Sequence, residues 1–191
     1  METNGNPDPK PGVETRTSFM FPWLHKRVAD AVHDQVGRVY YHEQGRDSDA
    51  RERFDTYVMG KFLCKNQSCE SDAWTSKKVS ITIRRFVDGS PGIGYNATVY
   101  NQACAACLTL GTFSIHQDTY VERVAYRLRK WAGVPQEKQY FDADDRPPHM
   151  ADLCEGCKRG HCKQGWELSY HNTTIPRHQN TEVPSGWFHI N

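Results

Sequence analysis

Seven cysteines lie in close groups that are separated by long stretches of chain. Their spacings are C-x4-C, C-x2-C and C-x2-C-x4-C, and the residues are Cys64, Cys69, Cys104, Cys107, Cys154, Cys157 and Cys162. A tight turn with two cysteines can direct both thiolates at one metal ion while its backbone N–H groups stabilise their charge. Disulfides are the alternative, but the odd count and the close pairs favour zinc.

A histidine is needed to complete the ligands, because two tetrahedral zinc sites require eight donors. His149 precedes Cys154 in the run H-x4-C-x2-C-x4-C, whereas His161 directly precedes Cys162. Adjacent residues seldom reach the same ion from one tight turn, so we expect His149 rather than His161 to bind.

Three divisions of these ligands are consistent with the sequence. In the local division, which we favour, the first four cysteines form one site and His149 with the last three cysteines forms the other. In the interleaved division, one pair from the first group joins one pair from the last motif. The third arrangement is a single zinc ion with three spare thiols.

The composition is polar for a compact domain. Hydrophobic residues make up 37% of the 191 residues, and the mean hydropathy is -0.78. We therefore expect metal ions to add to the stability that apolar burial supplies. The formal net charge of +1 shows no basic excess of the kind that indicates nucleic-acid binding.

Hydropathy also bears on the compartment. The chain has no run of about 18 apolar residues, so we expect no transmembrane segment. Its beginning, METNGNPDPKPGVETRTS, has neither the basic nor the apolar region of a secretory signal. These features predict a cytoplasmic protein, with a nuclear location also open. Cysteines in such reducing compartments more often bind metal than form disulfides.

A helix is predicted before the first cysteine pair. Apolar residues repeat at helical spacing from Phe21 to Val32, with Pro22 near the start and Gly37 after the end, which predicts an amphipathic helix over 21–36. The charged stretch 38–53 is expected to be an exposed connection.

A strand that leads to the first cysteine pair is expected to be followed by a two-stranded hairpin, which lies between the first and second cysteine pairs. A strand over 54–63 leads to the first cysteine pair, and the alternating Val79, Ile81 and Ile83 predict a strand with one buried face. A turn at 88–94 is followed by the alternating 95–99, which leads to the second pair. Metal-binding turns flanking a hairpin are the arrangement of a zinc ribbon.

A second helix is predicted after the hairpin. Thr119 and Glu122 fit a capping box, and Gly133 and Pro135 fit the helix end. One face is apolar and the other is basic. The apolar residues are Val121, Val124, Ala125, Leu128 and Trp131, and the basic ones are Arg123, Arg127, Arg129 and Lys130.

These elements predict an α+β fold, in which helices flank a small antiparallel zinc-ribbon-like sheet that structural zinc stabilises. We expect a disordered N-terminus over 1–17. The zinc-binding domain is expected over 18–165, with its ligands within 54–162, and an extended or partly docked tail over 166–191.

Several sequence words, in order, resemble the 3CxxC-type zinc finger family. They are GKFLC with Cys69, then AWTSKKVSI, YNQACAAC and PHMADLCEGCKRGHC. The likeness covers roughly 54–162 and extends more faintly to 20–165. The first pair is C-x4-C where the family usually has C-x2-C. The family is shared by receptor-transporting proteins, zygote arrest proteins and fungal proteins, and the resemblance implies structural zinc.

The resemblance implies an adaptor function, with RNA binding as the alternative. By likeness to receptor-transporting proteins, the domain is a protein-interaction adaptor or chaperone-like module, which would use apolar or aromatic surface around the first helix and the hairpin. By likeness to zygote arrest proteins, it is an RNA-binding regulatory module, with Trp74 or Tyr100 as stacking platforms. The basic residues for that role are Lys77, Lys78, Arg84, Arg85, Arg123 and Arg127.

Catalysis is not expected. A catalytic zinc keeps one position open for water, whereas eight ligands would close two sites. The segment DGSPGIG lacks the Lys-Ser/Thr of a phosphate-binding loop. We therefore expect no small-molecule substrate.

Overall fold

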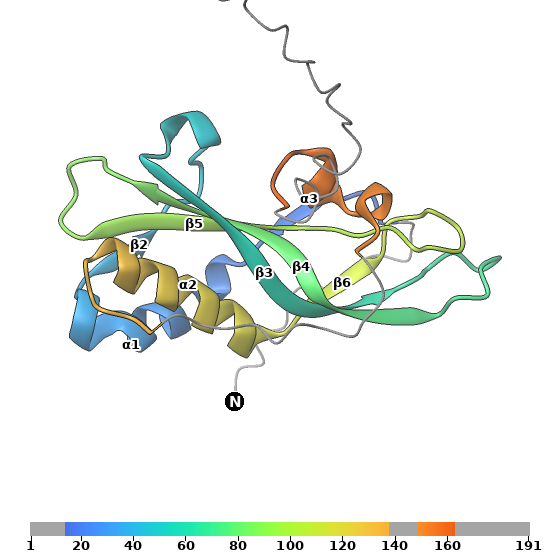
Figure 1. The fold of residues 1–191 in the computed structure, drawn as a ribbon, viewed down its shortest axis with the longest axis horizontal. Helices are drawn as coiled ribbons and strands as arrows, with labels where there is room; N and C mark the ends of the chain where they lie inside the picture. Colours follow the sequence, from blue (N-terminus) through green and yellow to red (C-terminus); the bar gives the residue numbers. More distant parts are fainter. Residues whose placement is uncertain (1–13, 138–148, 163–191) are drawn as a thin grey trace, which may run out of the picture.

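The computed structural model describes residues 14–137 and 149–162. In these ranges a six-stranded sheet lies between two helices on one face and a short C-terminal segment on the other (Figure 1). The strands are β1 (Ser18–Met20), β2 (Val39–Tyr41), β3 (Glu52–Leu63), β4 (Ala73–Phe86), β5 (Ile93–Tyr100) and β6 (Thr112–Ile115), and the helices are α1 (His25–Val36), α2 (Gln117–Trp131) and α3 (Glu155–Lys158).

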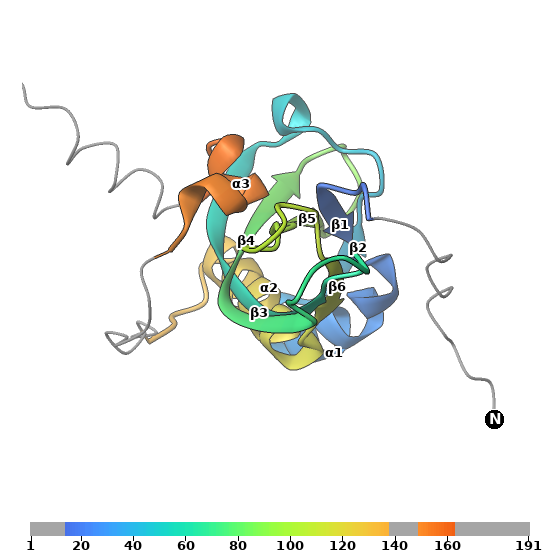
Figure 2. The same ribbon diagram turned by 90° about the vertical axis from the view of Figure 1, so that its right-hand side faces the viewer.

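The sheet is curled. Its strand order is β1-β5-β4-β3-β6, and β2 adds to the same edge of the sheet through β5. All pairs are antiparallel except β2 with β5. Although β1 and β6 stand at opposite ends of this order, the rings of Phe19 and Phe113 lie 5.4 Å apart. The end-on view shows the resulting curvature (Figure 2).

The two faces of the sheet differ because side chains alternate along each strand. In β4 the predicted apolar residues Val79, Ile81 and Ile83 are fully buried and belong to the hydrophobic core with α1 and α2. Their neighbours Ser80 and Thr82 are also fully buried, on the opposite face. The sheet therefore has one apolar and one polar buried face.

The predicted helices are confirmed, with shifted starts. A short 3-10 turn over Pro22–Leu24 precedes α1. The capping box predicted at Thr119 is wrong, because α2 begins earlier and His116 is its N-cap. The imidazole Nδ1 of His116 accepts a hydrogen bond from the Thr119 N–H at 3.4 Å. Gly133 follows the helix end with a positive φ of 78°, as its predicted role requires.

The stretch 38–53 is not merely an exposed connection. It contains β2, where Val39 is buried, and a 3-10 turn over Asp47–Asp49. The strands β1 and β6 were also missed, because three or four residues are too few to show a periodic pattern. Pairing with the longer strands β5 and β3 selects them instead.

Contacts to the sheet begin before the expected boundary at residue 18. The Asn101 N–H donates to the Thr17 carbonyl at 2.9 Å, and Glu14 forms a bridge with Leu110. Of the expected disordered stretch 1–17, residues 1–13 lie outside the described residues, as does the expected tail 166–191. The limits of the domain stay predictions.

Candidate metal centres

The first cluster is built from two turns at the same end of the sheet. One turn joins β3 to β4 and carries Cys64 and Cys69, and the other joins β5 to β6 and carries Cys104 and Cys107. Because β3, β4 and β5 are antiparallel neighbours, both turns meet at one end. The four Sγ atoms lie within 4.8 Å of one another.

The spacing of these sulfurs fits a tetrahedral zinc ion. A Zn–S bond of about 2.3 Å implies sulfur atoms about 3.8 Å apart in a tetrahedron. The Sγ atoms of Cys64 and Cys107 are separated by 3.6 Å, and those of Cys69 and Cys104 by 3.8 Å. The cluster thus has the geometry of a closed four-thiolate site.

Polar groups of the turns surround these thiols. The Thr109 hydroxyl lies 2.9 Å from Cys107 Sγ, and the Ser71 N–H donates to Cys69 Sγ at 3.4 Å. The hydrogen bond from Thr109 lowers the pKa of the Cys107 thiol to about 6, because it stabilises the thiolate. Leu108 takes a positive φ of 62°, which lets the chain reverse direction between the cysteine pair and Thr109.

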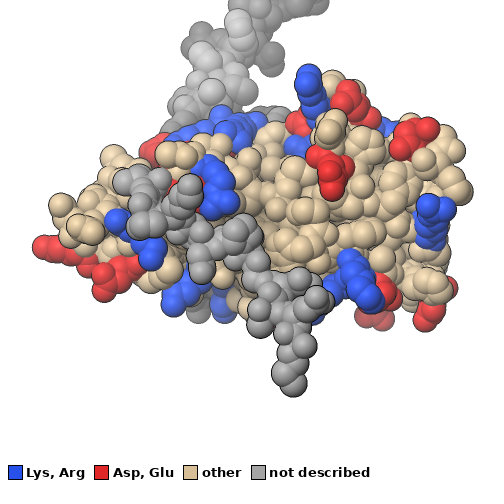
Figure 3. Space-filling model, turned by 180° about the vertical axis from the view of Figure 1, so that it is seen from behind, with Lys and Arg blue, Asp and Glu red and all other residues tan. Residues whose placement is uncertain are grey.

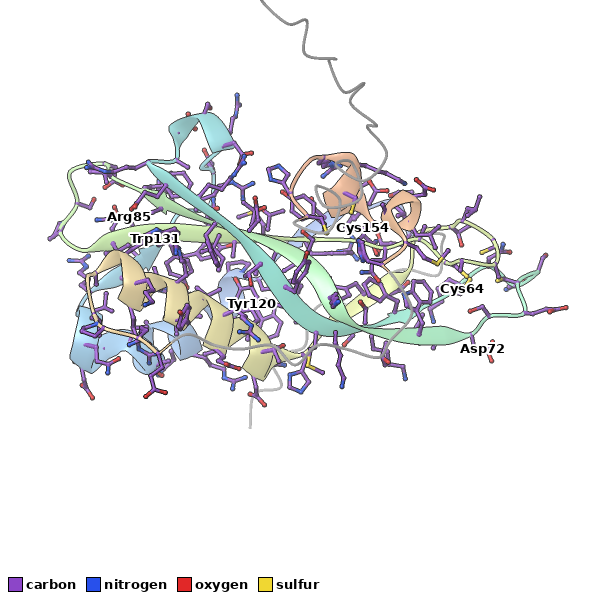
Figure 4. All side chains as sticks on the ribbon, in the orientation of Figure 1. Cys64, Asp72, Arg85, Tyr120, Trp131 and Cys154 are labelled. Carbon is purple, nitrogen blue, oxygen red and sulfur yellow. The ribbon has the colours of Figure 1, made fainter. Side chains whose placement is uncertain are left out.

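The second cluster lies on the polar face of the sheet. The Nε2 of His149 is 3.2 Å from Cys157 Sγ and 3.5 Å from Cys162 Sγ, and Cys154 completes the group. A Zn–N bond of about 2.0 Å with a Zn–S bond of about 2.3 Å places nitrogen and sulfur roughly 3.5 Å apart, so this cluster also fits zinc. Figure 4 shows Cys154 above the sheet and Cys64 at its end.

The second cluster is more protected than the first. Cys154 and Cys162 are each only 1% exposed, and the Tyr57 hydroxyl lies 3.7 Å from Cys162 Sγ. Hydrogen bonding between Cys154 and Cys162 lowers the pKa of the Cys162 thiol to about 3 and raises that of Cys154. Because metal ligands bind as thiolates, an ion at this cluster would replace thiol protons.

The structure separates His161 from this cluster. Its ring stacks on Tyr100 with centroids 5.1 Å apart and faces Asp47 and Asp55, whose carboxylate oxygens lie 3.4 and 3.6 Å from the ring nitrogens. The Ser80 hydroxyl donates to the His161 carbonyl. The donors are therefore grouped in the local division, with His149 in the second cluster.

The candidate RNA-binding residues do not share one surface. Arg84 is buried on the polar face, where it pairs with Asp47, while its neighbour Arg85 on the helix face pairs with Glu52 at 2.7 Å. Arg127 lies over the ring of Phe54, 4.1 Å from its centroid.

The remaining basic candidates differ in their exposure to solvent. Lys77 is exposed, and Lys78 and Arg123 are partly buried. Lys and Arg are scattered over the face that Figure 3 displays, with uncharged surface between them.

Several residues around the clusters were not predicted from the sequence. Thr109 stands two positions after Cys107, so its nearness to a ligand was the available signal. Asn101 and Gly156 lie inside the words YNQACAAC and CEGC. No local pattern in these words shows that the two residues make buried contacts. Tyr57 is far from the cysteines in sequence, and only the fold brings it to Cys162.

Two clusters of four zinc-type donors on a curled antiparallel sheet define a zinc-ribbon-like protein. The model of the 3CxxC zinc-ribbon family, described as a zinc-binding domain, matches residues 57–160, and the chain belongs to this family. No curated protein and no solved structure matches the chain significantly. Within the described ranges, no helix is both long and apolar enough to cross a membrane.

Proposed function

We propose that both clusters are structural zinc sites and that the domain is a non-catalytic interaction module. The first site would use Cys64, Cys69, Cys104 and Cys107, and the second would use His149, Cys154, Cys157 and Cys162. The observation that carries this proposal is the presence of four donors at tetrahedral spacing in each cluster.

The chemistry of the donors supports a structural role. Bound zinc would supply a cross-link between segments that are distant in sequence. Four protein donors fill a tetrahedral ion and leave no position for a catalytic water. The cytoplasmic location and the lack of a small-molecule substrate stay predictions.

Metal analysis of the purified protein tests the ligand sets. The wild-type chain is expected to contain two zinc ions, and Cys154→Ser is expected to contain one. His149→Ala should also lose one, whereas His161→Ala should retain both, because His161 lies apart from the sulfurs. A wild-type ratio near one, or loss of zinc from His161→Ala, would contradict the assignment.

An exposed aromatic surface supports the adaptor role over the RNA-binding one. Trp23 is 49% exposed, although its ring is held edge-on against the buried Phe21 at 6.0 Å between centroids. Met20, in the neighbouring β1, is 38% exposed. Ordered but accessible tryptophan is typical of residues that dominate protein interfaces. We propose that Met20 and Trp23 contact a protein partner.

Capture from the native organism, analysed for both protein and RNA, tests the adaptor role. A specific protein should be retained by the wild-type domain and lost with the double variant Met20→Ala, Trp23→Ala. Val87→Ala is the matched control, because Val87 is 60% exposed and apolar but lies on the β4–β5 turn. Salt-sensitive binding of single-stranded RNA without loss in the double variant would support the RNA-binding role instead.

A further inference from the structure

Asn101 is a completely buried amide between the two clusters. It follows β5, precedes Cys104 and is 0% exposed. Its Nδ2 donates to the carbonyls of Arg16 at 2.7 Å and Gly111 at 3.0 Å. Its Oδ1 accepts the N–H of Gln102 at 2.7 Å. The side chain therefore holds together the N-terminal segment, the end of β5 and the start of β6.

The backbone beside Asn101 forms one edge of the second cluster. The Asn101 carbonyl accepts the Glu155 N–H at 3.0 Å, and the Ala103 N–H donates to the Leu153 carbonyl at 2.8 Å. These two bonds flank Cys154, which forms a bridge with Gln102. The position of Cys154 is thus set by the chain on either side of Gln102.

On its other side, the segment 101–104 bonds to the turn of the first cluster. The Gly111 N–H donates to the Gln102 carbonyl at 3.0 Å, and the Cys104 N–H donates to the Thr109 carbonyl at 2.8 Å. These bonds close the turn that carries Cys104 and Cys107. Along 101–104, the backbone groups of successive residues therefore bond alternately to the segment of the second cluster and to that of the first.

We infer that Asn101 is a positioning residue for both zinc sites and couples their metal affinities. The inference rests on the proposed ligand sets. Zinc in the first site orders the turn after Gln102, and the ordered segment is the edge on which Cys154 docks. Binding at one site orders part of the segment that the other site also needs. The second ion therefore loses less conformational entropy on binding, and each ion should strengthen the binding of the other.

Cobalt titration of the metal-free full chain tests the role of Asn101, because four-sulfur and three-sulfur-one-nitrogen sites have different visible spectra. Asn101→Ala should weaken both sites by about 10–100-fold, the usual effect of removing a group that orients metal ligands.

Asn96→Ala is the matched control. Asn96 is 1% exposed on the same β5, and its Nδ2 donates to the carbonyls of His42 at 3.0 Å and Gly45 at 3.1 Å. It should lower stability and leave the affinities of both sites within a fewfold of wild type. Equal losses of affinity in the two variants would overturn the inference, since Asn101 would then act only through overall stability.

Single-site variants test the coupling even if Asn101→Ala does not fold. Cys69→Ser retains only the second site, and Cys157→Ser retains only the first. Each remaining site should bind cobalt several-fold more weakly than it does in the wild-type chain. Unchanged affinities would overturn the coupling, whereas a wild-type chain that binds one ion would instead contradict the ligand sets.

Discussion

At the scale of single residues, the groups around the ligands distinguish two chemically similar clusters. Thr109 places a hydroxyl against a thiol of the first cluster, and Tyr57 does so in the second. His161 shows the opposite case, since it adjoins Cys162 in sequence but packs against Tyr100. Whether a histidine lies with the sulfur atoms therefore depends on the direction of its ring in the fold more than on its distance from a cysteine in the sequence.

Thr109→Val is predicted to weaken zinc binding at the first cluster by about 10–100-fold, because it removes the hydrogen bond to Cys107 Sγ. That bond lowers the Cys107 pKa, so its loss should raise the pKa and move the pH of half-release of zinc upward. Competition with a chromophoric chelator across a pH series measures both effects. Thr109→Ser keeps the hydroxyl and should resemble wild type; equal weakening in both variants would contradict the prediction.

At the scale of elements, the polar face of the sheet is a docking surface for the last metal-binding motif. Ser80 of β4 bonds the His161 carbonyl and lies directly against Gly156 of α3. A Cβ added to Gly156 would lie 2.6 Å from Ser80 Cβ, closer than two non-bonded carbon atoms can approach. The glycine in CEGC therefore lets α3 lie flat on the sheet.

Gly156→Ala is predicted to destabilise the protein by about 1–3 kcal/mol, the usual cost of overpacking a tight contact. Denaturant unfolding of the zinc-loaded protein measures this cost, and zinc release from the second cluster should be faster. Asp152→Ala is the control, because Asp152 is exposed in the preceding 3-10 turn. Equal stability of the glycine variant and wild type would show that α3 is not in tight contact with β4.

At the scale of the whole molecule, the core and the clusters depend on the same strands. The strands β3, β4 and β5 contribute Val58, Ile81 and Val99 to the core, and their ends lead into the turns of the first cluster. The second cluster covers the other face of this sheet. Loss of metal is therefore expected to affect the domain as a unit.

A strong chelator is predicted to unfold the region 54–162, because the free energy of metal binding is part of the free energy of folding in such domains. Far-ultraviolet circular dichroism should lose its native shape on chelation and recover when zinc is added in excess. Retention of the native spectrum by a preparation shown to contain no metal would contradict this prediction.

The features that repeat locally could be predicted from the amino-acid sequence alone. Cysteine spacing predicted zinc-binding turns, alternation predicted the strand around Ile81, and helical periodicity predicted the two long helices. The strand and helix patterns reflect burial of one side of a single element, and the cysteine spacing reflects binding of a metal ion by a single turn, so a short stretch of chain shows each of them.

How distant parts of the chain meet follows from the fold and could not be predicted from local patterns. The fold grouped the donors four and four, brought the short strands β1, β2 and β6 to the edges of longer ones, and buried Asn101 between the clusters. It also placed Arg84 and Arg85 on opposite faces of the sheet, where each pairs with a carboxylate. These contacts depend on which strands pair and how the sheet curls, and residues far apart in the chain set both.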